Sequence, residues 1–174
     1  LASDFVSDNS ESGKVGQAFV ATRFDLAFPG FENRMGNNND PSVHLPGDVQ
    51  SARDGKYWLW AEAKQKSVVT PDVQTFLERI LEIKGDRAMY FALANEPYPQ
   101  NLNLEKLQKE AARKGVLLHV FVSPAQAFLE VISFAPGSAI DLATRFANTF
   151  NSRLREAAVT TELRNKWIEI ASSS

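Results

Sequence analysis

The chain has no cysteine, which excludes thiolate zinc sites, cysteine nucleophiles and disulfide frameworks. Its two histidines, His44 and His119, are too few for a metal cluster or a nuclease chemistry built on histidine. No apolar run reaches the length of a bilayer span, and the longest, such as residues 116–122, have the length of a buried strand. Because missing cysteine fits a reducing compartment, we expect a cytoplasmic protein that does not enter a membrane.

A strong charge of either sign is also lacking. Lys and Arg number 19 against 21 Asp and Glu, which gives a formal net charge of −2. This balance disfavours indiscriminate polyanion binding, although local basic clusters can still contact phosphates. The glycines form no Walker or Rossmann phosphate loop, so no nucleotide cofactor is expected.

With 174 residues, of which 44% are hydrophobic, the chain is long enough for one domain with a buried core. Residues 1–13 are rich in Ser, Asp, Asn and Glu, and we expect them to form a flexible N-terminal segment or linker. Residues 14–174 are expected to form a single domain. Because the chain starts at Leu1 and stops in Ala-Ser-Ser-Ser, we expect this domain to be excised from a longer protein.

Apolar periodicity and turn residues predict an α/β fold. Helices are expected at residues 14–26, 70–84, 104–114, 123–135, 138–155 and 161–170, and strands at residues 45–51, 57–64, 87–94 and 116–122. Asp54-Gly55 predicts a tight turn between the first two strands, and residues 31–44 are expected to be a long polar loop. The order αββαβαβ with extra C-terminal helices predicts a mixed β-sheet flanked by helices on both faces.

Asp48, Glu62 and Lys64 combine two acids and a lysine around the predicted hairpin. Side chains on a strand alternate between faces, so Glu62 and Lys64 point the same way. Asp48 lies on the neighbouring strand, where its carboxylate can meet that of Glu62. We therefore take these three as the candidate catalytic residues. The alternative interpretation is a solvated strand face, since Asp, Glu and Lys are abundant residues.

Two convergent carboxylates suit Mg²⁺, a hard cation that prefers oxygen ligands and keeps waters and substrate phosphate oxygens in its octahedron. Asp48 and Glu62 are the expected ligands. Lys64 beside them could orient or help deprotonate an attacking water and offset charge in the transition state. This chemistry is the hydrolysis of a phosphodiester.

Residues 46–48 (Pro-Gly-Asp) and 60–66 (Trp-Ala-Glu-Ala-Lys-Gln-Lys) resemble the signature of the PD-(D/E)xK nucleases. The longer stretch, residues 13–91, resembles SacI-type type II restriction endonucleases. Gly47 separates the proline from Asp48, so Asp48 is assigned by its place on the strand. The resemblance implies a restriction-endonuclease-like core with two metal-binding acids and a lysine that supports the nucleophilic water. We also expect the backbone carbonyl of Ala63 as a metal ligand.

Such nucleases often carry a further acidic or polar residue on the first helix, facing the metal. Glu11, Gln17 and Asp25 are the candidates here, and each could equally be a surface residue. His44, next to the predicted site, is another auxiliary candidate. His119 lies within an apolar strand and is expected to be a hydrogen-bonded core histidine.

Candidate DNA contacts lie in the polar loop, because Arg and Asn side chains make bidentate hydrogen bonds to guanine and adenine edges. These residues are Arg34, Asn37, Asn38 and Asn39. A flexible, turn-rich loop is the alternative. Lys66 shares the predicted strand face of Lys64 and could contact a phosphate, or simply face solvent. Trp58 and Trp60 are expected in the core rather than as a stacking platform for bases.

These patterns predict a Mg²⁺-dependent endonuclease that cuts double-stranded DNA at a specific sequence, as type II restriction enzymes of restriction-modification systems do. A homodimer is expected, because a two-fold symmetric DNA site is naturally cut by a two-fold symmetric protein. Two alternatives remain open. The chain could be a repair or recombination nuclease that recognises DNA structure, or a DNA-binding module whose nuclease site is inactive.

Overall fold

The computed structural model describes residues 1–36, 45–94 and 102–173. Seven helices lie in these residues: α1 (Ala2–Asp8), α2 (Lys14–Ala27), α3 (Thr70–Glu82), α4 (Leu104–Arg113), α5 (Pro124–Ile132), α6 (Ala139–Glu156) and α7 (Thr161–Ser172). The five strands are β1 (Glu32–Met35), β2 (Val49–Arg53), β3 (Lys56–Lys64), β4 (Arg87–Ala92) and β5 (Leu117–Phe121). None of the described helices is long and apolar enough to cross a membrane.

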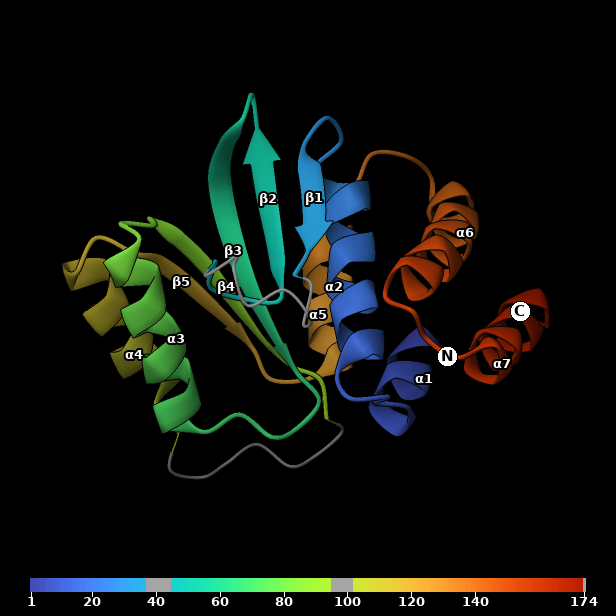
Figure 1. Ribbon diagram of the computed structural model, residues 1–174, viewed down its shortest axis with the longest axis horizontal. Helices are drawn as coiled ribbons and strands as arrows, with labels where there is room; N and C mark the ends of the chain where they lie inside the picture. The colour runs from blue at the N-terminus through green and yellow to red at the C-terminus, as the bar shows by residue number, and fades with distance from the viewer. Residues whose placement is uncertain (37–44, 95–101, 174) are drawn as a thin grey trace.

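The strands form one mixed sheet in the order β1-β2-β3-β4-β5. The pairs β1–β2 and β2–β3 are antiparallel, whereas β3–β4 and β4–β5 are parallel. Helices α3 and α4 cover one face of the sheet and α2 and α5 cover the other, with α6, α7 and α1 beyond α2 (Figure 1). The mixed sheet with helices on both faces confirms the α/β prediction.

Strand β3 separates two hydrophobic cores. Leu59, Ala61 and Ala63 point into the core that contains α2, and Trp60 points into the core that contains α3. This alternation follows from the two-residue period of a strand, so a strand covered on both faces is apolar almost throughout. The predicted burial of β3 on both faces, and of Trp60 in the core, is therefore confirmed. Trp58 is only half-buried.

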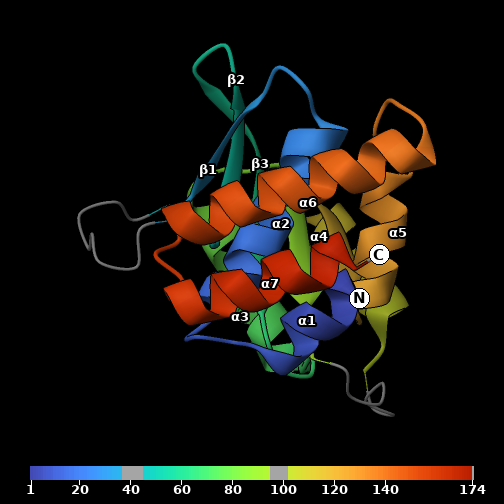
Figure 2. The same ribbon diagram turned by 90° about the vertical axis from the view of Figure 1, so that its right-hand side faces the viewer.

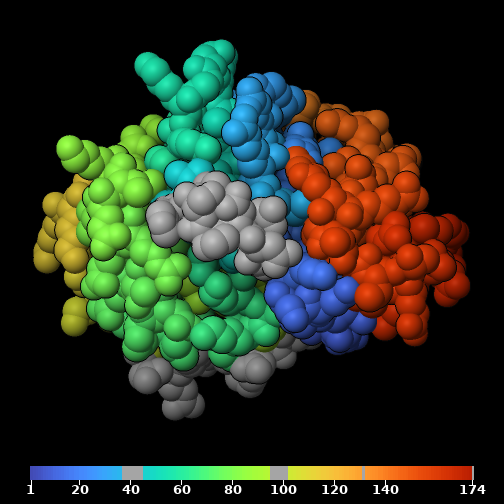
Figure 3. All heavy atoms as spheres, in the orientation of Figure 1, coloured from blue at the N-terminus to red at the C-terminus, as the bar shows by residue number. Residues whose placement is uncertain are grey.

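The hairpin between β2 and β3 also matches its prediction. Asp54 and Gly55 both have positive φ, at 51° and 73°, as a two-residue turn with the twist of its flanking strands requires. The turn projects from one end of the molecule (Figures 1 and 3). The turn sets the register next to it, and an irregularity between Ser51 and Ala52 shifts the pairing by one residue, so that residue 48 lies opposite the far end of β3.

The expectation of a flexible segment at residues 1–13 is wrong for α1. Phe5 and Val6 are buried, and the Phe5 ring centroid lies 5.4 Å from that of Trp167 and 6.0 Å from that of Phe150. Figure 2 shows α1 beside α7, with α6 and α7 running next to each other. Phe5 therefore packs against the C-terminal helices α6 and α7. The polar composition of residues 1–13 alone gives no information on these distant partners.

The loop predicted at residues 31–44 contains strand β1, so that prediction is wrong for Glu32–Met35. β1 is a short polar edge strand held by backbone pairing to β2 and by a buried contact in which the Ser51 hydroxyl donates to Asn33 Oδ1. Its sequence carries no alternating apolar pattern, and this is why it was not expected. Residues 37–44 lie outside the described residues.

The predicted core position of His119 is also wrong. Its side chain is 43% exposed, and its Nε2 lies 3.0 Å from Glu130 Oε2 of α5. The expected hydrogen bond is present, but the alternation of the edge strand β5 turns this side chain toward a partly open surface rather than into a core.

Candidate active site

Asp48 immediately precedes β2, and its backbone pairs with β3. The Asp48 N–H donates to the Ala61 carbonyl at 2.7 Å, and Asp48 Oδ2 accepts from the Ala63 N–H at 2.8 Å. The Asp48 carboxylate thus accepts from the Ala63 N–H, where a backbone carbonyl would be the acceptor in a continued β2–β3 pairing. Because both bonds go to β3, the Asp48 carboxylate is held against the end of that strand.

Gly47 allows this close approach. Its φ is +83°, and a Cβ at this position would lie 2.5 Å from the Ala61 carbonyl oxygen. Any other residue would both adopt a left-handed backbone conformation and collide with β3. The glycine between Pro46 and Asp48 is therefore required by the position of Asp48.

Glu62 and Lys64 complete a three-residue cluster at the end of β3. Lys64 Nζ lies 2.5 Å from Glu62 Oε1 and 3.7 Å from Asp48 Oδ2. The side chain of Glu62 is 8% exposed, that of Asp48 22% and that of Lys64 37%. The three residues expected from sequence thus converge, with the two acids toward the interior and the lysine toward solvent.

The cluster is electrostatically strained around Glu62. Burial, and next the negative charge of Asp48, raise the pKa of Glu62 despite the opposing effect of Lys64 and Arg79. Burial acts to lower the pKa of Lys64, but the attraction of Asp48 and Glu62 outweighs it and the pKa of Lys64 is raised. Lys64 is therefore a firmly protonated ammonium, and it is the positive charge that offsets the two carboxylates.

The donor set fits a hard divalent cation that retains several waters. The ammonium group of Lys64 contacts both carboxylates and supplies a positive charge there, so the two carboxylates already accommodate one cationic group. Among residues 1–36, 45–94 and 102–173, no group of three or more His, Asp or Glu side chains could hold a metal. Two carboxylates with waters and phosphate oxygens are the kind of set by which proteins commonly bind Mg²⁺.

The backbone carbonyl of Ala63 faces the side of β3 on which Asp48 lies. The Lys64 carbonyl accepts from the Leu93 N–H at 2.7 Å, so the Lys64 carbonyl points toward the β4 side of β3. Successive peptide groups in a strand alternate in direction, and the Ala63 N–H already points at Asp48. The Ala63 carbonyl is consequently directed toward Asp48, as a backbone metal ligand would need.

Asp48 and Lys64 line a cleft of about 310 Å³, and Glu62 lies behind them without lining it. The N-terminal end of α2, the turn before it and the end of β3 form its walls. The lining residues are Ser10, Ser12, Gly13, Gln17, Asp48, Ala63, Lys64, Gln65 and Lys66. A phosphate group could therefore reach Lys64 and Asp48 from solvent.

The structure distinguishes among the auxiliary candidates. Gln17 Nε2 donates to the carbonyls of Asp48 at 3.0 Å and Gly36 at 3.1 Å, so Gln17 positions the Asp48 backbone. Asp25 forms an ion pair with Arg153 at 2.7 Å, which makes it part of the α2–α6 packing. His44 lies outside the described residues.

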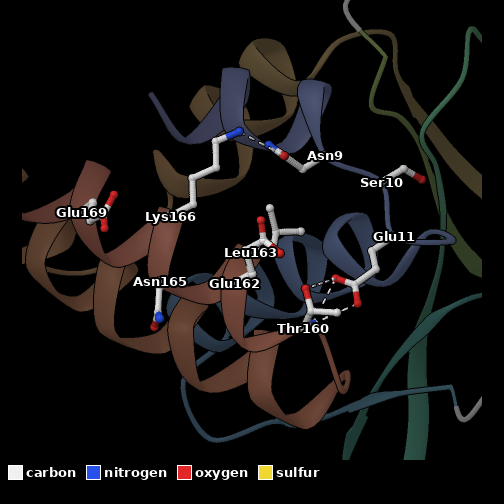
Figure 4. Close-up of a pocket in the computed structure, with 9 residues that line it drawn as sticks. All are labelled: Asn9, Ser10, Glu11, Thr160, Glu162, Leu163, Asn165, Lys166 and Glu169. Atoms are coloured by element: carbon white, nitrogen blue, oxygen red, sulfur yellow. Dashed lines mark hydrogen bonds between the residues drawn. The ribbon is translucent and has the colours of Figure 1, made fainter.

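Glu11 is also directed away from the cluster. Its Oε1 accepts from the Thr160 N–H at 2.9 Å, which satisfies a free amide at the start of α7. Figure 4 shows this contact within a separate polar pocket between α7 and the turn after α1. Of the first-helix candidates, the structure thus brings only Gln17 to the cluster.

Of the candidate DNA contacts that the structure describes, Lys66 lines the cleft and Arg34 does not. Arg34 is exposed on β1 and its Nη2 lies 2.7 Å from Glu32 Oε2. Lys66 follows the end of β3 rather than continuing its face, and its Nζ lies 2.6 Å from Asp72 Oδ2. Asn37, Asn38 and Asn39 lie outside the described residues.

Gln65 was missed by sequence reasoning. Its Nε2 donates to the carbonyls of Val6 at 2.6 Å and Asn9 at 2.7 Å, and its Oε1 accepts from the Gly16 N–H at 3.3 Å. These bonds fasten the turn between α1 and α2 to the residue after Lys64, and so hold one wall of the cleft. Its place beside the predicted lysine is the only sequence signal for this role.

Comparison with protein-family models finds none that matches the chain, and a search of curated proteins finds no match. The function is therefore argued from the geometry of the cluster.

Proposed function

We propose that this chain is a Mg²⁺-dependent endonuclease that hydrolyses phosphodiester bonds of double-stranded DNA, with Asp48, Glu62 and Lys64 as its catalytic residues. The observation that carries the proposal is the contact of Lys64 Nζ with both carboxylates, at 2.5 Å from Glu62 and 3.7 Å from Asp48, with Lys64 and Asp48 lining a cleft. Salt bridges on a protein surface are common, but here one acid is buried and its pKa is raised. A buried acid with a perturbed pKa beside a cleft is common at functional sites.

Asp48 and Glu62, with the Ala63 carbonyl, would hold the metal ion. When bound, Mg²⁺ would supply Lewis-acid stabilisation of the charge that develops on the phosphate. Lys64, which the carboxylates keep protonated, can hold the attacking water by a hydrogen bond and stabilise the negative transition state. Gln17 and Gly47 keep Asp48 in place during this step.

The resemblance of residues 46–48 and 60–66 to PD-(D/E)xK nucleases supports the same proposal. The order of elements agrees with it. Asp48 and Glu62 lie at the open end of the antiparallel β2–β3 hairpin, and β3 also pairs in parallel with β4, which follows helix α3. On this basis we propose a restriction-endonuclease-like core, cleavage at a fixed sequence, and a cytoplasmic homodimer.

The proposal is tested by digesting mixed plasmid DNA with the full chain and Mg²⁺, followed by sequencing of the ends. Fixed sequences at the ends support a restriction-type enzyme. Cleavage confined to branched or damaged DNA would instead indicate a repair or recombination nuclease. Tight DNA binding with no cleavage would indicate an inactive binding module, and neither binding nor cleavage would refute the proposal.

A further inference from the structure

Tyr90 of β4 is completely buried, yet its hydroxyl has no hydrogen-bond partner among the residues that the structure describes. Its relative exposure is 0%, and within the described part of the chain its Oη makes no hydrogen bond. A buried hydroxyl that forms no hydrogen bond costs stability, and native proteins rarely leave one without a reason. Phenylalanine would fill the same space without this cost.

The tyrosine lies beside the catalytic cluster. Tyr90 is the register partner of Glu62 across the parallel pair β3–β4, and partners in a sheet project from the same face. Both side chains point toward α3, where the Tyr90 ring centroid lies 6.1 Å from that of Phe76. Two buried polar side chains on this face are thus neighbours.

The Tyr90 hydroxyl keeps its proton and can donate a hydrogen bond in this position. Burial, followed by the negative charges of Asp72, Glu62 and Asp48, raises the pKa of Tyr90. Its proton is therefore retained at neutral pH. The competing acceptor, Asp72, has Lys66 Nζ at 2.6 Å from its Oδ2, although that oxygen also makes no hydrogen bond within the described residues.

Glu62 needs such a donor during the reaction. Its carboxylate now contacts Lys64 Nζ at 2.5 Å. A metal cation bound at that oxygen would displace the ammonium, because like charges repel. A buried carboxylate that loses its partner is then free to rotate and is poorly solvated.

We propose that Tyr90 is a positioning residue of this site, whose hydroxyl donates a hydrogen bond to the Glu62 carboxylate when Lys64 turns away from it. The bond fixes the carboxylate in the orientation that binds the cation. This inference rests on the proposed function, since it assigns to Glu62 the role of a metal ligand.

The test compares Tyr90→Phe with Tyr57→Phe, a matched removal of one hydroxyl from a more exposed tyrosine at the hairpin. Three quantities are measured on the full chain: the midpoint of thermal unfolding without metal, the affinity for Mn²⁺ without DNA, and the single-turnover cleavage rate at saturating Mg²⁺. Mn²⁺ serves as the probe because its binding is read directly by electron paramagnetic resonance.

Tyr90→Phe should unfold at the same or a higher temperature, because it removes an unpaired buried hydroxyl. Its Mn²⁺ affinity should fall about tenfold, as expected for the loss of a hydrogen bond to a charged group. The cleavage rate should fall with it, and Tyr57→Phe should bind Mn²⁺ as the wild type does.

Unchanged Mn²⁺ affinity in Tyr90→Phe would overturn the inference. A joint loss of thermal stability and affinity would also overturn it, because it would show that the hydroxyl acts only in packing. A wild-type protein that binds Mn²⁺ but cuts no DNA would refute the proposed function while leaving the role of Tyr90 measurable. A wild-type protein that does not bind Mn²⁺ would refute both.

Discussion

Glu62→Gln should stabilise the protein while abolishing its activity. The substitution keeps the shape of the side chain and one carbonyl acceptor for Lys64, but removes a negative charge that is 8% exposed and lies beside Asp48. Active sites commonly hold such groups at a cost in stability, and replacing them commonly raises stability at the expense of activity.

The sign follows from the raised pKa of Glu62. The folded state holds the Glu62 proton more tightly than the unfolded state does, so ionisation at neutral pH favours unfolding. This penalty is absent below the ordinary pKa of glutamate and grows as pH rises to the folded-state pKa. The partial loss of the Lys64 ion pair reduces the gain, and we expect a net stabilisation of about 1 kcal/mol at pH 7. For a chain of this length that corresponds to about 2–4 °C in the unfolding midpoint.

The assay is thermal unfolding of wild type and Glu62→Gln in metal-free buffer at pH 4 and at pH 8, beside Mg²⁺-dependent cleavage. The stabilisation should be larger at pH 8 than at pH 4. Glu78→Gln, an exposed position on α3, is the matched control and should change neither quantity. A lower midpoint for Glu62→Gln at pH 8 would show that the ion pair with Lys64 outweighs the burial of Glu62, and would refute this reasoning.

Three further outcomes are expected. Lys64→Ala should lower the single-turnover cleavage rate roughly 10²-fold or more with little loss of metal binding, whereas Lys66→Ala should weaken DNA binding at most. A dead Lys66 variant beside a normal Lys64 variant would reverse the assignment. Replacing Mg²⁺ by Ca²⁺ should permit DNA binding but suppress turnover, because the larger ion accepts looser coordination; equal rates with both ions would contradict the mechanism. Gly47→Ala should destabilise the protein by roughly 2 kcal/mol or more in chemical denaturation and abolish cleavage, since its Cβ would lie 2.5 Å from the Ala61 carbonyl oxygen. A variant of normal stability would show that residues 46–48 move freely away from β3.

Local patterns were sufficient where the determining contacts are close in sequence. The Asp54-Gly55 turn starts the β2–β3 pairing, and a register shift between Ser51 and Ala52 completes the alignment that brings Asp48 to the end of β3 beside Glu62 and Lys64. The hairpin and the approach of Asp48 to β3 could therefore be predicted without a structure, whereas the register shift was not. The chemistry of the cluster could be inferred as well, because strand alternation alone places Glu62 and Lys64 on one face.

Contacts with the C-terminal helices could not be predicted in this way. Phe5 packs against Trp167, which is why a polar N-terminal stretch folds as a helix. Asp25 and Glu11 resemble auxiliary site residues until Arg153 and Thr160 are seen to bind them. Such partners lie more than a hundred residues away, and no periodicity in the chain relates them.

Tyr90 carries no sequence signal for its position either. It lies in an apolar strand where an aromatic residue is expected to be core, and its ring does pack in the core. Only the register between β3 and β4 shows that Tyr90 is the neighbour of Glu62 across the strand pair.

The central claim is that Asp48 serves cleavage rather than folding, and the most direct measurement is the single-turnover cleavage rate of Asp48→Asn with Mg²⁺. Asparagine keeps an oxygen that can accept from the Ala63 N–H, so the fold is retained while the charge is lost. Asp54→Asn is the matched control, because Asp54 lies in the β2–β3 turn with a side chain that is 92% exposed. We predict wild-type cleavage by Asp54→Asn and none by Asp48→Asn at an unchanged unfolding midpoint. Cleavage by Asp48→Asn at the wild-type rate would contradict the account.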